Sequence, residues 1–343
     1  SGGISLGSYE AGLNWALVKY LKIRRNEIIA AEPNRLPPEL MSSVVASAGS
    51  INALISALSW CVDDDKIKAI GQTQSGQAGF TYSDSINNNM FRNLWVNVGI
   101  DEMLPAKGSA YRTGDGVFTR AAFDDAISQI TETLKADIFR EDCNLPLGMT
   151  VTRVEPVKMS IVGVEVENQR FMIPVRLQTA QDDKQSGRIE IVSQLVNKDD
   201  PFLGNVMYLR EAKLAAEQHY VIEPEHLIDA ILTSSAYPVA FGKVALPHCA
   251  SQASNDESAN PHECPPGYYS RVDEFIDGGV FDNVPLGIAK ALAEPREKDL
   301  YTRDRWQDTA RPFSYIYLDP DVRRPVISST STVLLEPQTQ EEE

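Results

Sequence analysis

The spacing of apolar side chains along the chain predicts several amphipathic helices. Apolar residues recur at helical spacing in four stretches, which are 9–24, 48–60, 118–139 and 224–232. A similar apolar face over 90–98 is interpreted as core packing, with a lid or the wall of an acyl-chain site as the alternative.

Other apolar stretches are short or alternate with polar residues, which is typical of strands. Alternation over 164–178 and 188–196 predicts a hairpin, which we expect to be inserted at the edge of a sheet. Shorter apolar runs predict further strands, which are 44–45, 147–154, 271–276 and 313–318.

The order of these elements indicates the fold class. Strands that alternate with helices are typical of an α/β fold, so we expect a mostly parallel central sheet flanked by helices, with an inserted β-hairpin region at about 155–200. One domain is expected to span 1–325, followed by an acidic, disordered tail over 326–343. Ligands of parallel sheets bind beyond the carboxyl ends of the strands, so functional residues are sought there.

The charge balance narrows the classes of partner. The chain has 343 residues and a net charge of −16, which argues against nucleic acid as a partner because binding needs clustered Lys and Arg. The same charge gives no general attraction to anionic membranes, so contact with a membrane or micelle is expected to come from an apolar patch. No apolar run reaches the roughly 18 residues of a membrane-spanning helix.

The start of the chain bears on its cellular location. Ser1 leads at once into a glycine-rich turn, and such a turn should follow a strand. We therefore expect the natural chain to begin upstream, where a targeting signal could lie. The sequence is compatible with a soluble protein and with one peripheral to a membrane, and it slightly favours the cytoplasm. It predicts no oligomeric state.

The four cysteines are too few for a disulfide-built scaffold; they are Cys61, Cys143, Cys249 and Cys264. Two of them stand beside histidines, in His248-Cys249 and His262-Glu263-Cys264, on either side of a polar loop. Free thiols, one disulfide closing the loop, and a zinc site are the alternatives. The adjacency of His248 and Cys249 is poor ligand spacing, so no metal and no other cofactor is expected.

Ser47 lies between a predicted strand and a predicted helix, in Val45-Ala46-Ser47-Ala48-Gly49. A strand–serine–helix turn holds the hydroxyl clear of the backbone and brings the next N–H toward an attacked carbonyl. The small neighbours fit this turn, although Val45 stands where G-x-S-x-G has its first glycine. A nucleophilic serine and a helix-capping serine are both compatible with this pattern.

A glycine-rich loop, with Gly2, Gly3 and Gly7, opens the chain before the first predicted helix. Backbone N–H groups at such a loop can converge on negative charge. The N–H groups of Gly2, Gly3 and Ile4, together with that of Ala48, are therefore candidates for an oxyanion hole. A complete G-x-G-x-x-G is absent, which disfavours a dinucleotide site.

Asp277 follows a predicted strand and precedes Gly278 and Gly279. The glycines let the backbone turn sharply and keep the carboxylate uncovered, which makes Asp277 a candidate base. The alternative is an ordinary turn aspartate.

The positions of the histidines favour a dyad of Ser47 and Asp277. All four histidines precede Asp277, whereas an α/β-hydrolase triad runs from serine through the acid to histidine. A triad would need a different acid, Asp182 or Asp183, with His219 or His226. A serine–aspartate pair is the simpler assignment.

These motifs, in this order, resemble those of the patatin-like phospholipase family. The resemblance rests on Gly2-Gly3 with Gly7-Ser8-Tyr9-Glu10-Ala11-Gly12, on Ala46-Ser47-Ala48-Gly49 and on Asp277-Gly278-Gly279. Two further segments are similar, Thr233-Ser234-Ser235-Ala236-Tyr237-Pro238 and Phe281-Asp282-Asn283-Val284-Pro285-Leu286. The resemblance covers about 1–325, without the hairpin region and the tail.

The resemblance implies a metal-independent acyl hydrolase acting on lipid or phospholipid esters. Ser47 would be the nucleophile and Asp277 its base, with Gly2, Gly3 and Gly7 shaping the oxyanion loop and Gly49 in the serine turn. Ile4 and Leu6 stand where the family usually has glycine and a basic residue, and Val45 is a further departure. Acyl transfer to another alcohol, and an inactive lipid-binding or scaffold domain, remain the alternatives.

Overall fold

The computed structural model describes a large part of the chain, and all structural statements below refer to that part. The described residues are 4–32, 35, 37–66, 89–96, 103–104, 116–120, 123–161, 164–180, 187–196, 205–213, 220–251, 263–282, 285–293, 314 and 316. The expected strand over 313–318 and the expected acidic tail lie outside these residues, apart from two isolated positions.

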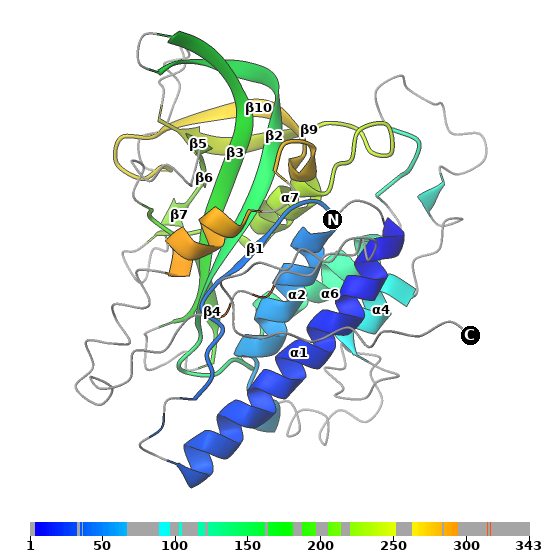
Figure 1. The fold of residues 1–343 in the computed structure, drawn as a ribbon, viewed down its shortest axis with the longest axis vertical. Coiled ribbons are helices and arrows are strands. Elements are labelled where there is room, and N and C mark those ends of the chain that lie inside the picture. The colour runs from blue at the N-terminus through cyan, green and yellow to red at the C-terminus, as the bar shows by residue number, and fades with distance from the viewer. Residues whose placement is uncertain are drawn as a thin grey trace, which may run out of the picture.

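The predicted helices are present, with different bounds. The named helices are α1 (Ile4–Ala31), α2 (Gly49–Cys61), α4 (Met90–Val96), α6 (Asp124–Leu134) and α7 (Pro224–Ser234). α2 is buried almost all round, because it packs between α1 and the strands β1 and β2 (Figure 1). α7 begins with a proline in its first turn, where no backbone N–H is needed.

Most of the strands join one curved sheet of eight strands. The strands are β1 (Ser43–Val45), β2 (Asn144–Ile161), β3 (Val164–Thr179), β4 (Ile189–Ser193), β5 (Asn205–Val206), β6 (Tyr208–Leu209), β7 (Ala212–Lys213), β8 (Tyr220–Val221), β9 (Val244–Ala250) and β10 (Tyr269–Asp277). The order is β4-β3-β2-β10-β9-β6, with β1 on β2 and β5 on β3, and β7 and β8 pair separately.

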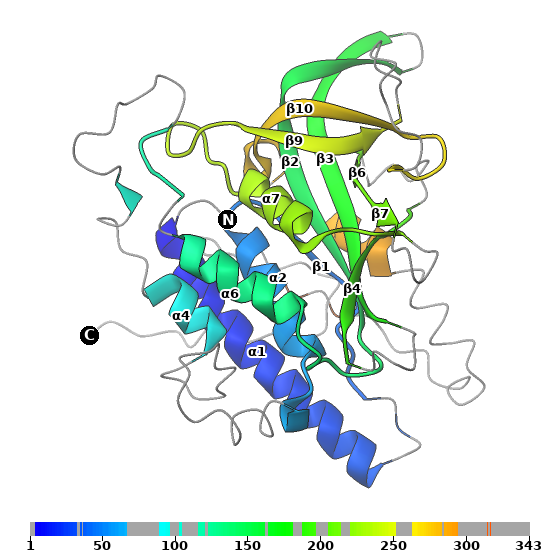
Figure 2. The same cartoon turned by 180° about the vertical axis from the view of Figure 1, so that it is seen from behind.

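The expectation of a mostly parallel sheet is wrong. Neighbours along the main path are antiparallel, and only the short pairs β1–β2 and β3–β5 are parallel. The sheet curves into a nearly closed, barrel-like form (Figure 2). The physical reason is that the connections from β2 to β3 and from β3 to β4 are short in the sequence, and a parallel pair needs a crossover of about a dozen residues or more.

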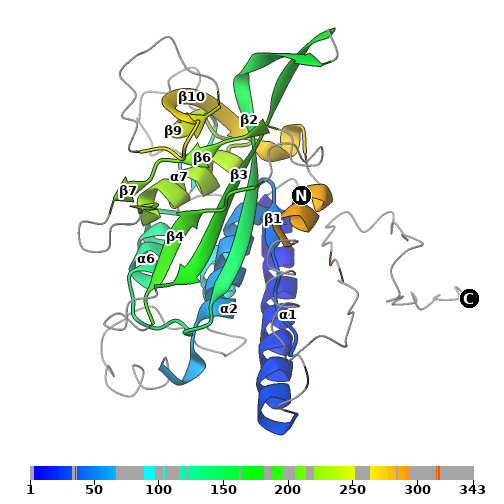
Figure 3. The same cartoon turned by 90° about the vertical axis from the view of Figure 1, so that its left-hand side faces the viewer.

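The predicted hairpin is present as β3 and β4, and it lies at one end of the sheet, as expected, because β4 is the terminal strand of the main path. β3 pairs with β2 along one edge and with β4 and β5 along the other. Its alternate side chains Phe171, Ile173, Val175 and Leu177 are buried in the main core. Figure 3 shows β2 and β3 as the longest strands, with α1 standing beside the sheet.

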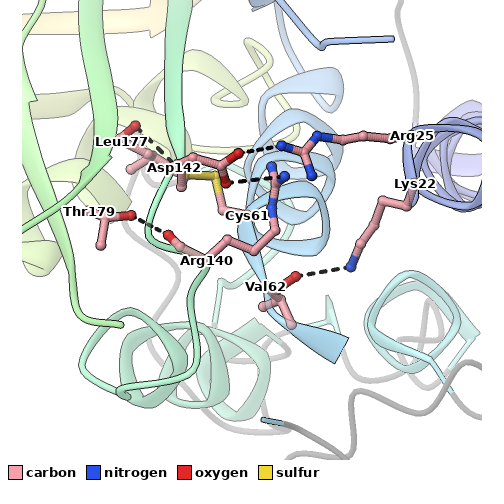
Figure 4. The surroundings of a disulfide bond; sticks show 9 residues. Lys22, Arg25, Cys61, Val62, Arg140, Asp142, Leu177 and Thr179 are labelled. Carbon is pink, nitrogen blue, oxygen red and sulfur yellow. Dashed lines mark hydrogen bonds and ion pairs between the residues drawn. A yellow bond between two sulfur atoms is a disulfide. The ribbon is translucent and has the colours of Figure 1, made fainter. Parts of the chain in front are cut away.

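All four cysteines are paired in two disulfides. Cys61, the last residue of α2, is bonded to Cys143 just before β2 (Figure 4). Cys249 of β9 is bonded to Cys264, which closes the polar loop as one of the alternatives proposed. The Cys61–Cys143 bond was not predicted, because cysteines 82 positions apart carry no signal of pairing in a single sequence.

The Cys61–Cys143 disulfide lies among contacts that fix the C-terminal end of α2. Arg140 donates its backbone N–H to Cys61, and its guanidinium lies 5.1 Å from the centre of the Trp60 ring. The side chain of Arg25 on α1 bonds to Asp142, as Figure 4 shows, and also to Glu39. α1, α2 and the start of β2 are therefore joined at this end.

Among the described residues, none of the helices combines the length and the apolarity that crossing a membrane requires.

Candidate active site

Ser47 occupies a strained turn between β1 and α2. Its backbone has a φ of 58°, in the left-handed region that non-glycine residues rarely adopt. The turn is closed by two bonds, from Gly49 N–H to the Ala46 carbonyl and from Ser50 N–H to the Ser47 carbonyl. Such strain is typical of functional turns, where the surrounding structure holds one side chain in a required direction.

Val45 is accommodated in this turn without a glycine. It pairs with Met149 in the parallel β1–β2 ladder, and its Cβ lies 3.7 Å from where a Cβ on Gly49 would stand. The side chain packs against the main hydrophobic core. This departure from the family pattern is therefore compatible with the strand–serine–helix geometry.

Asp277 ends β10 and caps a short 3₁₀ helix, η2 (Gly278–Val280). Its Oδ1 accepts a hydrogen bond of 2.6 Å from the Gly279 N–H. Its own N–H donates to the Ala236 carbonyl in the segment after α7. One carboxylate oxygen and the backbone are thus fixed, which leaves Oδ2 for another partner.

That partner is Ser47, whose Oγ donates to Asp277 Oδ2 at 2.5 Å. Both residues are buried, with exposed fractions of 4% for Ser47 and 1% for Asp277. Burial raises the pKa of the Asp277 carboxyl above its usual value, against the opposing effect of the bonds from Ser47 and Gly279. A higher pKa makes this carboxylate a stronger base toward a hydroxyl.

The two residues meet because β1 and β10 lie end to end on one edge of β2. β1 runs parallel to β2, and its last residue, Val45, lies opposite Met149 of β2. β10 runs antiparallel to β2, and its last residue, Asp277, lies opposite Val151 of β2. β3 occupies the other edge of β2 over the same residues. The two strands therefore run toward each other, and their carboxyl ends meet at the intervening residue, Thr150.

Thr150 holds this junction together from several sides. Its Oγ1 lies 3.4 Å from the Val45 carbonyl, and its own carbonyl accepts a 2.8 Å bond from Ser234 Oγ at the end of α7. A Cβ on Gly278 would lie 2.0 Å from the Thr150 carbonyl oxygen, so only glycine fits there. Thr150 was not singled out by the sequence analysis, since a threonine within a predicted strand gives no local signal.

The predicted oxyanion residues are only partly described. Gly2 and Gly3 lie outside the described residues, and Ile4 is the first residue of α1. The expectation that Gly7 belongs to a loop before the first helix is wrong, because Gly7 lies within α1. Ala48 is buried and precedes α2 directly.

α1 and α2 begin close to each other near the middle of the molecule (Figure 1), and Asn52 near the start of α2 bonds to Gly7 near the start of α1. The first N–H groups of a helix have no partner within it, which makes a helix start suited to negative charge. In α2 the N–H groups of Gly49 and Ser50 are bonded to the serine turn, so the candidate donor there is that of Ala48.

The described histidines have other surroundings. His248 Nδ1 bonds to the Leu246 carbonyl, and its Nε2 lies 3.3 Å from Asp273 in β10. His226 is in the first turn of α7. His219 and His262, like Asp182 and Asp183, lie outside the described residues.

Because Cys249 and Cys264 are bonded to each other, the zinc alternative for that loop is excluded. Across the described part of the chain, no group of three or more His, Cys, Asp or Glu could hold a metal ion.

Comparison with known proteins gives one match. Neither the curated proteins nor the solved structures include a significant match to the chain. A family model described as patatin-like phospholipase matches residues 1–290, which is most of the chain and includes Ser47 and Asp277. The chain therefore belongs to the patatin-like phospholipase family, a family of lipid acyl hydrolases.

Proposed function

We propose that this protein is a serine acyl hydrolase of the phospholipase A or lysophospholipase type. It would cleave fatty-acyl ester bonds of phospholipids or related lipids, with Ser47 as nucleophile and Asp277 as base. The observation that carries the proposal is the 2.5 Å hydrogen bond from Ser47 Oγ to Asp277 Oδ2, within a strained strand–serine–helix turn.

The first half of the reaction follows from that bond. Ser47 Oγ attacks the ester carbonyl while its proton passes to Asp277 Oδ2. The same proton then goes to the leaving alcohol, and the fatty-acyl chain stays on Ser47 as an ester. Gly279 N–H holds Oδ1 throughout, so the carboxylate keeps one orientation during both proton transfers.

The second half repeats the steps with water. Asp277 takes a proton from a water molecule, which attacks the carbonyl of the acyl-enzyme. The bond to Ser47 Oγ then breaks, Asp277 returns the proton to Oγ, and the fatty acid is released. The oxyanion formed in each half would be held by backbone N–H groups of Gly2, Gly3, Ile4 and Ala48. Preorganised donors of this kind are worth about 10²–10³ in kcat each.

Exposed apolar side chains on both sides of Asp277 support a lipid aggregate as the substrate. Tyr237 and Val239 follow the carbonyl that binds the Asp277 N–H, and Val280 and Phe281 follow Asp277 itself. Val239 is 79% exposed and has a φ of 71°, which is unusual for a β-branched residue. Since the net charge is −16, neutral membranes or micelles are the surface that suits these residues best.

The alternatives differ in what happens after the first step. Acyl transfer would use the same acyl-enzyme with an alcohol in place of water, and added glycerol or lysolipid would then yield new acyl esters. An inactive scaffold would form no acyl-enzyme. The bond between Ser47 and Asp277 favours an active pair over a scaffold, because a buried carboxylate is costly without a role.

The test is covalent labelling followed by a lipid panel. A fluorophosphonate should add once to the wild-type protein, at Ser47, and Ser47→Ala should not react. Wild type, but not Ser47→Ala, should release fatty acid from phospholipid or lysophospholipid. An adduct on another serine with Ser47 unmodified would rule out the proposed nucleophile.

A further inference from the structure

A buried polar relay connects the first helix to the helix that follows the nucleophile. Asn52 lies on α2 and is fully buried. Its Nδ2 donates a 3.0 Å hydrogen bond to the carbonyl of Gly7, in the first turns of α1. Its Oδ1 accepts a 2.6 Å hydrogen bond from Nε1 of Trp95 on α4. One amide therefore ties together three helices that are distant in the sequence.

The chemistry of the three groups fixes the orientation of the Asn52 amide. An indole N–H can only donate and a backbone carbonyl can only accept. The amide oxygen must then face Trp95, and the amide nitrogen must face Gly7. A buried amide with both ends satisfied resists rotation, because turning it would leave two buried groups unpaired.

Gly7 is held on a second side by the Trp95 ring. A Cβ on Gly7 would lie 2.3 Å from the ring carbon Cη2, so the indole occupies the space that a side chain would need. The carbonyl of Gly7 is thus fixed by Asn52, and its α-carbon is covered by Trp95. α1 has no freedom to shift at this point without breaking one of the two contacts.

The relay also lies close to the nucleophile turn. Asn52 is one helical turn after Gly49, and the position of a Cβ on Gly49 is 3.4 Å from Oε1 of the buried Glu10 on α1. The two helices are therefore in contact from the residue that ends the serine turn to Asn52. A shift of α1 would move its N-terminal N–H groups relative to Ser47.

We infer that Asn52 and Trp95 are positioning residues, which hold the N-terminal turn of α1 and its oxyanion donors in place relative to Ser47. This inference rests on the proposed function, since it assigns the α1 turn a role in that reaction. Neither residue touches the reacting atoms. Their effect is expected in kcat, because misplaced donors weaken binding of the transition state rather than of the ester.

Asn52→Asp tests the relay with a nearly isosteric side chain. When protonated, an aspartic acid donates to Gly7 and accepts from Trp95 as the asparagine does; when ionised, it cannot donate. The quantity to measure is kcat of Asn52→Asp on a soluble short-chain ester, divided by kcat of wild type at the same pH. We expect this ratio to fall by about 10- to 100-fold as pH rises, while KM changes less than about threefold.

Further variants separate positioning from simple destabilisation. Asn52→Leu should lose kcat at every pH and show no recovery in acid. Trp95→Phe keeps a ring against Gly7 and removes only the N–H, so a smaller loss of kcat is expected. The matched control is Ser56→Ala, one turn further along α2, which removes a buried bond to the Asn52 carbonyl and leaves Gly7 untouched. Its kcat should equal that of wild type.

Two outcomes would overturn the inference. The first is a folded Asn52→Leu or Trp95→Phe protein with wild-type kcat. The second is a ratio of kcat for Asn52→Asp to kcat for wild type that does not change with pH. Failure of the proposed function looks different, because wild type would then show no turnover that depends on Ser47, and both ideas would fall together.

Discussion

Gly278 lies directly against Thr150, the residue at which β1 and β10 meet on the edge of β2. The distance from a Cβ on Gly278 to the Thr150 carbonyl oxygen would be 2.0 Å, far inside any real contact. That carbonyl also accepts the hydroxyl of Ser234. The position of Asp277, one residue earlier, therefore depends on a backbone contact that no side chain can replace.

Gly278→Ala is expected to abolish most activity and to destabilise the fold. The added methyl must push η2 away from Thr150, which moves Asp277 from Ser47, and overpacking of this kind costs about 1–3 kcal/mol. Chemical unfolding and ester turnover measure the two effects. Gly12→Ala is the matched control, since nothing lies within 4 Å of a Cβ there. It should keep full activity and gain about 0.5–1 kcal/mol, because alanine favours a helix interior.

Val45→Gly is expected to keep or raise activity while lowering stability by about 1 kcal/mol. The serine turn is closed by backbone bonds that do not need the Val45 side chain, whereas glycine costs backbone entropy and a strand contact. Turnover of a soluble ester and the free energy of unfolding should be measured on the same preparation. A folded variant without activity would show that Val45 itself is required.

The pH dependence of activity should reflect the buried carboxyl of Asp277. Its pKa is raised by burial, and only the deprotonated form accepts the Ser47 proton. Turnover is therefore expected to fall on acidification at a pH above the ordinary range of an aspartate. A profile of kcat/KM against pH measures this, and a flat profile down to the usual aspartate range would contradict it.

The same shift gives a prediction for stability. A carboxyl with a raised pKa in the folded state stabilises the fold most below its unfolded pKa, and this contribution is lost as pH rises through the folded pKa. Asp277→Asn should thus be at least as stable as wild type at neutral pH, with the advantage shrinking in acid. Urea unfolding over a pH series tests this, and a constant deficit at every pH would refute it.

Removal of the Cys61–Cys143 disulfide should cost more stability than removal of Cys249–Cys264. The first closes a separation of 82 residues and the second one of 15. Loop entropy gives about 4.5 kcal/mol for the longer loop and about 3 kcal/mol for the shorter. Double alanine variants of each pair, compared by denaturant unfolding, measure the difference.

Thiol labelling of the denatured, unreduced protein should find no free cysteine. Full labelling would contradict both bonds and would fit a reducing compartment.

The sequence allowed the proximity of Ser47 and Asp277 to be predicted better than the sheet that positions them. Ser47 follows β1, as expected, and Asp277 is the last residue of β10, but the expected parallel rim is not what joins them. Instead, β1 and β10 approach each other head-on along β2. Hydrophobic periodicity reports that a segment is a strand, whereas its direction and neighbours depend on contacts far apart in the sequence.

Other parts of the site lacked any local signal. Thr150 and Asn52 matter through contacts with segments that lie 43 to 128 positions away in the sequence, so neither stands out from its neighbours. Trp95 was interpreted as core packing, and its ring does belong to the core, but its N–H has a specific partner. The small residues around Ser47 and the glycines after Asp277 were informative because backbone geometry restricts those positions directly.

The most direct test of the central claim is a kinetic series that treats Ser47 and Asp277 as one unit. Ser47→Ala, Asp277→Asn and the double variant are compared with wild type, and His219→Ala and His226→Ala serve as controls, with folding checked by circular dichroism. Each dyad variant should lose at least about 10³ in kcat, and the double variant should lose little more than either alone. Both histidine variants should keep most activity. Near-wild-type turnover in folded Asp277→Asn, or a histidine variant as inactive as Ser47→Ala, would contradict the dyad.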